Sequence, residues 1–415
     1  MNAATSGQNV PGKVPEESPR RAGNRPLFLL ALAGFGCSAS VRVTDAELPR
    51  LAEVFDINLL QASSVITAFA AGYGLMQLLY GPLGERYGKY RVATLLAGAC
   101  ALTSFLCALA PSLPWLIAAR ALAGATAAGI VPLSLAWIGD TIAYEQRRIV
   151  MARFIMGQIS GLAAGSFLGG VAAQYLDWRA PFIALSVWFA TVAILLLRLG
   201  GEAMQLPPPQ MPRQTLLGSL RNMASLFARP WPRTVLMAAF AEACFFFGAF
   251  SFVPATLHEL NGLSLSQAGL VAMALAAGGV IYALLSGQII GRLREAQTAR
   301  LAGFVMAIAL PLITLAPGPW TAALASALSG FGYYMMHNTL QVSATQMAPE
   351  SRGVAVTLFA AVFFLGQSIG TSVVAALVHG VGPLPVFLGC SVMLAALGLG
   401  FGARHPNHHA QSRHT

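Results

Sequence analysis

The sequence predicts an all-α membrane protein with twelve transmembrane helices in two pseudo-symmetric six-helix bundles. Three observations predict this fold: the composition, a succession of long apolar segments, and a set of landmarks that repeats once along the chain. Of 415 residues, 56% are hydrophobic and only 10% are charged, and the mean hydropathy is +0.66. Because soluble domains carry about 25% charged residues, this composition excludes an ordinary water-soluble domain.

A helix needs about 20 mostly apolar residues to cross a bilayer, and twelve such spans fit the chain. The first six spans are 27–46, 61–81, 92–110, 113–136, 149–174 and 178–199. The second six are 233–257, 267–288, 299–316, 319–341, 352–379 and 381–402. We therefore expect a disordered N-terminus (1–25), a first bundle (26–199), a linker (200–232), a second bundle (233–403) and a polar tail (404–415).

The distribution of basic residues predicts the orientation of these spans. Alternate connectors and the two ends hold 21 of the 25 lysines and arginines, and the rest of the chain holds only Arg42, Arg50, Arg120 and Arg179. Because cytoplasmic loops are enriched in basic residues, N-terminus, linker and tail are all expected in the cytoplasm. We expect a multi-pass protein of a cell membrane, the inner membrane of a bacterium, whose first helix is not cleaved as a signal peptide.

The net charge of +10 does not indicate nucleic-acid binding, because the cations lie in short loops between apolar spans. The five cysteines lie inside apolar segments without metal-ligand spacing, so they are expected to pack as small hydrophobic residues. The sequence thus predicts no nucleic-acid partner, no metal and no cofactor.

An internal repeat predicts the two-bundle architecture. The pattern from Gly81 recurs 206 residues later from Gly287, and the spaced glycines from Gly161 recur 205 residues later from Gly366. Gly72 matches Gly278 in the same register. Duplicated halves of this kind are related by an axis along the membrane normal and hold a central site near the bilayer midplane.

The loop between spans two and three carries the first motif. Its residues are Gly81, Glu85, Arg86, Gly88, Lys89 and Arg91. This pattern is similar to G-x-x-x-D-R-x-G-R/K-R/K of the major facilitator superfamily, and the whole chain resembles the twelve-span drug:proton antiporters of that superfamily. Glu85 stands where the family has aspartate, and Tyr90 interrupts the basic pair. The resemblance implies a charge network that stabilises the outward-open state, with Asp140 as partner of the arginine.

Span five carries the second motif, Gly161, Gly165, Gly169 and Gly170. It resembles the antiporter signature G-x-x-x-G-P-x-x-G-G, with Ser166 in place of the proline. Small residues at this spacing make a groove into which another helix packs. The alternative is ordinary helix packing, and the missing proline weakens the inference of export over import.

Three charged residues are candidates for proton coupling: Glu242 in span seven, Asp45 at the end of span one, and Arg120 in span four. A charge within a span is costly and is usually functional. Arg120 is a candidate partner of Glu242 across the cavity, and the alternative for Glu242 is a neutral, hydrogen-bonded structural acid. For Asp45 the alternative is a solvated pair with Arg42 at the end of the helix. The resemblance places an arginine such as Arg120 near the proton path, and the alternative is an arginine bound to backbone carbonyls.

Further polar and aromatic side chains are candidates for the wall of a substrate cavity, because pockets for organic molecules combine aromatic surface with a few polar groups. For His337 in span ten, a buried histidine with all its hydrogen bonds made inside the protein is as good an interpretation as a contact with the substrate. The candidates are Arg42, Tyr73, Gln77, Phe246, Tyr282, Tyr333, His337, Asn338 and Gln341.

No phosphate-binding loop, HExxH, GxSxG or pair of catalytic acids occurs in the sequence. We therefore predict no enzymatic activity. The resemblance implies a secondary transporter that exports a small organic or drug-like solute in exchange for protons by alternating access, working as a monomer in the lipid bilayer. The alternatives are a proton-coupled importer or facilitator of a metabolite such as a sugar or organic acid and, more remotely, a membrane receptor without transport activity.

Overall fold

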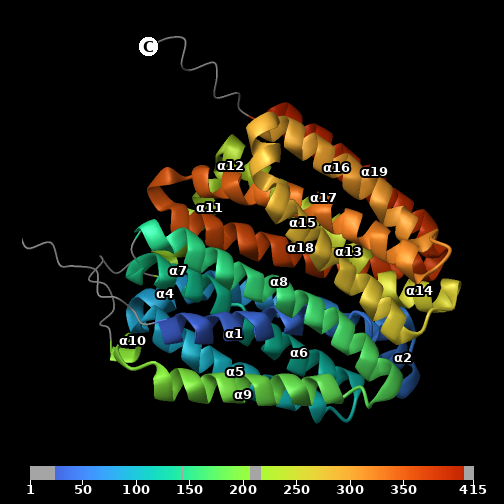
Figure 1. Cartoon of the computed structure of the whole chain (residues 1–415), viewed down its shortest axis with the longest axis horizontal. Coiled ribbons are helices and arrows are strands. Elements are labelled where there is room, and N and C mark those ends of the chain that lie inside the picture. Colours follow the sequence, from blue (N-terminus) through green and yellow to red (C-terminus); the bar gives the residue numbers. More distant parts are fainter. Residues whose placement is uncertain (1–23, 143, 206–215, 406–415) are drawn as a thin grey trace, which may run out of the picture.

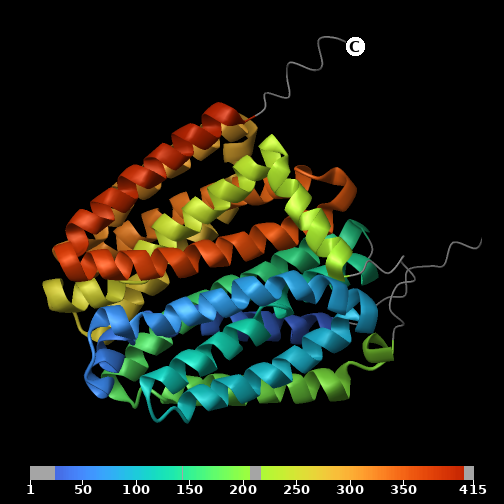
Figure 2. The same ribbon diagram turned by 180° about the vertical axis from the view of Figure 1, so that it is seen from behind.

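The computed structural model describes residues 24–142, 144–205 and 216–405, and these residues form helices with no strand among them. Most of the expected N-terminal segment and tail lie outside the described residues. Figure 1 shows the helices of the first half, from blue to green, lying alongside those of the second half, from yellow to red. Figure 2 shows the same two layers from behind.

The first half contains seven long helices. They are α1 (Asn24–Arg42), α4 (Ser64–Tyr87), α5 (Lys89–Ala108), α6 (Leu113–Ala127), α7 (Ile130–Thr141), α8 (Tyr144–Tyr175) and α9 (Ala180–Leu199). Two short helices, α2 (Leu48–Phe55) and α3 (Leu59–Ala62), connect α1 to α4. Only two residues separate α6 from α7, and the two helices together make the fourth predicted span.

The segment between the halves contains α10 (Glu202–Gln205) and α11 (Leu216–Ala228). Sequence reasoning treated 200–232 as a polar connector, and the helix α11 is an addition to that expectation. Met223 and Leu226 of α11 are buried, because this helix packs against α12 and α18 of the second half and against α4 of the first.

The second half repeats the first with one broken helix. It comprises α12 (Pro230–Glu242), the π-helix η1 (Ala243–Phe247), α13 (Gly248–Phe250), α14 (Val253–Asn261), α15 (Leu265–Arg292), α16 (Glu295–Thr314), α17 (Pro319–Gln346), the 3-10 turn η2 (Pro349–Ser351), α18 (Arg352–Val381) and α19 (Pro383–Arg404). The segments from α12 to α14 together occupy the seventh predicted span.

In the described residues, ten helical segments are long and apolar enough to cross a membrane. The predicted spans one and ten, where α1 and α17 lie, are not among these ten. Both are long helices, of 19 and 28 residues, so the structure is consistent with twelve spans. Their lower hydropathy has a physical reason, because both helices carry the polar side chains of an internal cavity.

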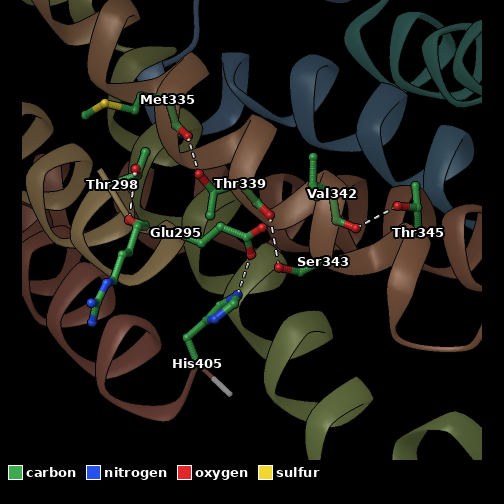
Figure 3. A network of polar contacts seen from close by, with 9 residues as sticks. Glu295, Thr298, Met335, Thr339, Val342, Ser343, Thr345 and His405 are labelled. Atoms are coloured by element: carbon green, nitrogen blue, oxygen red, sulfur yellow. Dashed lines mark hydrogen bonds and ion pairs between the residues drawn. The ribbon is translucent and has the colours of Figure 1, made fainter. Parts of the chain in front are cut away.

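Several hydroxyl groups of α17 form hydrogen bonds within the helix itself. Thr339 Oγ1 donates to the carbonyl oxygen of Met335 at 2.9 Å, and Ser343 Oγ donates to that of Thr339 at 3.0 Å (Figure 3). Figure 3 also shows His405, just past α19, with its Nε2 2.7 Å from Oε2 of Glu295 at the start of α16. The hydrogen bonds within α17 let this helix of modest hydropathy cross an apolar layer.

Equivalent glycines show the pseudo-symmetry of the two halves. A Cβ atom added to Gly165 of α8 would lie 2.4 Å from the carbonyl oxygen of Ala39 in α1. At the matching position of α18, a Cβ on Gly370 would lie 2.2 Å from the carbonyl oxygen of Cys244. The repeat read from the sequence therefore corresponds to the same close helix pairing in both halves.

The two halves meet along two helix pairs, α8 with α15 and α4 with α18. Gln174 Oε1 near the end of α8 accepts a hydrogen bond from the backbone nitrogen of Leu265 at 2.9 Å. Ser368 Oγ of α18 donates to the carbonyl oxygen of Thr67 in α4 at 3.0 Å. These contacts lie at the same end of the molecule and close the space between the halves there.

Candidate functional site

A cavity of about 950 Å³ lies between the two halves. It is lined by residues of α1, α4, α7 and α8 from the first half and of η1, α17 and α18 from the second, with Met223 of α11 at its edge. Its wall extends to the exposed residues Glu85, Glu350 and Arg352. The cavity is therefore open at the end opposite the contacts between α8 and α15.

The structure places six of the nine predicted cavity residues in this wall: Arg42, Tyr73, Gln77, Tyr333, His337 and Gln341. Phe246 lies behind the wall, fully buried, with its ring stacked on Tyr333 at 4.9 Å. Tyr282 and Asn338 also lie outside the cavity wall. They bond to each other instead, with Asn338 Nδ2 donating to the Tyr282 hydroxyl at 2.9 Å. Asn338 follows His337 by one residue and so lies about 100° further round α17, towards α15.

A buried carboxyl group contacts the cavity wall through a histidine. Glu242 is fully buried at the end of α12, and its Oε2 lies 3.0 Å from Nδ1 of His337. The His337 side chain lines the cavity and is 21% exposed. The other oxygen of Glu242, Oε1, has no hydrogen-bond partner among the described residues.

The chain geometry next to Glu242 is unusual. Residues Ala243–Phe247 form a π-helix, a local widening that is often found at functional sites. The widening brings the rings of Phe246 and Phe247 against Tyr333, at 4.9 and 4.8 Å between centroids. His337 stacks on the same tyrosine at 5.3 Å. The acid–histidine pair is thus held by a rigid aromatic cluster.

Arg42 and Asp45 form a second buried pair, with Nη1 of Arg42 3.0 Å from Oδ2 of Asp45. Both side chains are only 1% exposed, so this is not the solvated pair considered as the alternative. The guanidinium carbon of Arg42 lies 3.7 Å from the ring centre of Phe247. Arg42 comes from the first half and Phe247 from the second, so this cation–π contact joins the halves.

Arg120 is bound mainly by backbone carbonyl groups. Its Nη1 and Nη2 each lie 3.2 Å from the carbonyl oxygen of Ser40, and its Nε donates to that of Val65 at 3.4 Å. The guanidinium also lies over the ring of Phe69, 4.2 Å from its centre. Arg120 does not line the cavity. The sequence suggested Arg120 as the partner of Glu242, but the structure shows that this partner is His337 of α17.

The charged loop lies at the open end of the cavity, and Gly81, Glu85 and Lys89 form part of its wall. Lys89 Nζ donates to Oδ2 of Asp140 at 2.5 Å, so a lysine of the motif, and not the expected arginine, pairs with this aspartate. Arg91 Nε donates to the carbonyl oxygen of Met204 at 2.7 Å. Arg86 lies over the ring of Tyr87, 5.1 Å from its centre.

Gly88 ends α4 with a φ of +94°, a conformation that favours glycine. The tight reversal lets α5 begin at the next residue, Lys89. The glycine in the motif thereby sets the position of the lysine that reaches Asp140.

The glycines of span five have two different neighbours. Gly161, Gly165 and Gly169 face the backbone of α1, and a Cβ on any of them would come within 2.4 Å of a carbonyl oxygen. Gly170 faces α15 instead, where an added Cβ would lie 2.5 Å from the carbonyl oxygen of Leu265. The groove predicted from their spacing is filled by α1, and the last glycine serves the contact between the halves.

Sequence reasoning missed Glu47, which is fully buried beside α2. Neither of its carboxyl oxygens has a hydrogen-bond partner among the described residues, and Arg120 and Asp177 are the charges that act on it. It also missed Phe364 and Gln367 in the cavity wall. The sequence did offer a signal for Glu47, because it is an acid only two residues after Asp45. Phe364 and Gln367 lie in an apolar span that carries no charged residue near them.

Comparisons with known proteins agree on the kind of protein. The model of the Major Facilitator Superfamily matches residues 30–371. An uncharacterised transporter of that type, YceJ of Bacillus subtilis (strain 168), is 25% identical over 331 residues, which cover 79% of this chain and 82% of the relative. The crystal structure of a mutant of the nucleoside transporter NupG superposes with a TM-score of 0.73 at 14% identity, covering 91% of this chain and 98% of that one.

Proposed function

Because the chain belongs to the Major Facilitator Superfamily, it is a membrane transporter and not an enzyme, and we propose that it exports a small organic solute in exchange for protons. The observation that carries this proposal is the contact between Glu242 and His337. A fully buried carboxyl group whose described partner lines the cavity is suited to take up and release a proton at the substrate site.

The two pairs of contacting helices support transport by alternating access. The cavity is closed where α8 meets α15 and α4 meets α18, and it is open beside the charged loop. With both termini in the cytoplasm, as the basic residues predict, this is the inward-facing state of a monomer in the inner membrane of a bacterium. Solute would enter from the cytoplasm and leave after the halves rock against each other.

Proton and solute are coupled if each disfavours the other at a shared site. A protonated Glu242–His337 pair and a deprotonated pair differ in charge at the cavity wall, so they bind the same solute with different affinity. Arg42 and Asp45 form the buried pair of the first half, and Arg42 faces Phe247. Asp45 is the second candidate for the proton, and Arg120 would contribute through the position of α1.

The proposal is tested in everted membrane vesicles that contain the protein and a preformed pH gradient. We expect at least one compound of a broad panel of toxic organic molecules to collapse the gradient, and overproduction of the protein to protect cells from that compound. Uptake driven by external acid in right-side-out vesicles would instead establish import. Absence of flux with every compound in both preparations contradicts coupled transport.

A further inference from the structure

Two aromatic residues and two glutamines from opposite halves meet in the cavity wall. Tyr73 and Gln77 lie one turn apart on α4, and Phe364 and Gln367 lie one turn apart on α18; all four line the cavity. The rings of Tyr73 and Phe364 are stacked, with centroids 3.8 Å apart and planes 25° from parallel. This is a direct face-to-face contact between the halves at the closed end of the cavity.

One amide oxygen of the two glutamines is buried without a partner. Gln77 is 3% exposed, and its Oε1 has no hydrogen-bond partner among the described residues. Gln367 is 2% exposed. An amide buried without a partner costs about 1–3 kcal/mol, so such groups in a native protein are usually satisfied by a ligand or by water.

The charges in the deep part of the cavity are balanced. Arg42 lies 3.0 Å from Asp45, and His337 lies 3.0 Å from Glu242. The other charged residues of the wall, Glu85, Lys89, Glu350 and Arg352, belong to its open end. A permanently charged solute would therefore find no uncompensated opposite charge beside the two glutamines, whereas a neutral solute loses little on leaving water.

From this arrangement we propose that Tyr73, Gln77, Phe364 and Gln367 form the specificity subsite, and that its ligands are planar, uncharged aromatic molecules with an amide-like edge. Because the rings of Tyr73 and Phe364 already stack on each other, the aromatic face of the ligand packs against the edges that this pair presents to the cavity. Each glutamine offers both a donor and an acceptor to the edge of the ligand. The inference rests on the proposed transport function for its physiological meaning, but ligand binding itself does not depend on proton coupling.

The position of the subsite gives ligand binding a mechanical consequence. One aromatic–glutamine pair belongs to α4 of the first half and the other to α18 of the second. A ligand held by both pairs senses the relative position of the halves, because its affinity falls when they move apart. A differential affinity of this kind is what allows a ligand to shift a conformational equilibrium.

Binding of four small probes to the purified full-length protein in detergent tests the proposal. The probes are 2-quinolone, which is planar, neutral and bears an amide edge; quinoline, which lacks the amide; ε-caprolactam, which lacks the aromatic rings; and N-methylquinolinium, which is a cation. Isothermal titration calorimetry should rank 2-quinolone first. Gln77→Leu should weaken its binding about tenfold or more and leave quinoline binding unchanged.

Gln288→Leu is the matched control, because Gln288 is exposed on α15 outside the cavity wall, and it should bind 2-quinolone like the wild type. Gln77→Met, which keeps the length of the side chain but lacks the amide, replaces Gln77→Leu if the latter is not monodisperse in size-exclusion chromatography. The proposal is overturned if 2-quinolone does not bind at millimolar concentration, if ε-caprolactam or the cation binds as well, or if the glutamine variants match the control. Intact binding without proton flux contradicts only the proposed coupling.

Discussion

Nδ1 of His337 on α17 lies 3.0 Å from Oε2 of Glu242 on α12. The two residues are 95 positions apart in sequence. The histidine faces the cavity while the acid is completely buried. Among the described residues, His337 is the side chain that connects this carboxyl group to the cavity wall.

Glu242→Gln should abolish proton-linked transport, because the amide retains the shape of the carboxyl group but cannot exchange a proton. The variant should still insert into the membrane and bind ligand. Proton flux in everted vesicles measures the effect. Glu259→Gln on α14, at an exposed position, is the control and should transport normally; unchanged coupling in Glu242→Gln would refute the role of the acid.

His337→Gln should slow proton exchange without removing the carboxyl group. A glutamine can still hydrogen-bond to Glu242 but cannot take up and release a proton as an imidazole can. We expect the transport rate to fall and its dependence on pH to change shape. His379→Gln, on an exposed part of α18, provides the comparison, and identical pH profiles for both variants would rule out a relay through His337.

Gly165→Ala should destabilise the protein, because the new methyl group would lie 2.4 Å from the carbonyl oxygen of Ala39 and force α1 away from α8. Overpacking of this kind costs about 1–3 kcal/mol. Thermal unfolding in detergent should show a lower midpoint. Gly389→Ala on α19, where no atom lies within 4 Å of the added Cβ, should raise the midpoint or leave it unchanged, and equal shifts for both would contradict the close packing.

Glu85→Ala should increase the share of molecules open to the cytoplasm. Glu85 is exposed at the open end of the cavity, so the carboxylate can contribute to a charge network only when this end closes. A cysteine at the cavity position Thr357, in a background without the five native cysteines, reports the change. Faster labelling from the cytoplasmic side is expected; the same rate as in the exposed control Glu53→Ala would exclude an effect on the equilibrium.

The sequence was sufficient to predict the helices, because long apolar segments have few alternatives in a bilayer. The spaced glycines, such as Gly165 and its match Gly370, predicted that another helix packs closely there, and the structure identifies these partners as α1 and the segment from α12 to η1. The same reasoning placed Arg42, Tyr73 and His337 in the cavity wall. The depth of a residue in the membrane follows from its position within a predicted span, and these three residues lie at the depth of the cavity.

Direction around the helix axis was less predictable. Arg120 and Glu242 lie at comparable positions in their spans, yet Arg120 points to the carbonyl oxygen of Ser40 and Glu242 to His337. The π-helix after Glu242 changes the direction in which the Phe246 and Phe247 side chains point from the helix. No periodic pattern in the sequence predicts this π-helix. Phe364 and Gln367 were missed because their importance comes from α4, which lies opposite them only in the folded chain.

Gly170 of α8 and Gly269 of α15 meet without side chains between them. Helices that interlock through large side chains must change rotamers before they slide, but two glycine faces offer no such obstacle. At this contact α8 and α15 can turn against each other with little activation energy. The barrier to switching is then expected at the hydrogen bonds between the halves, from Ser368 to Thr67 and from Leu265 to Gln174, where the turnover rate of the transporter would be set.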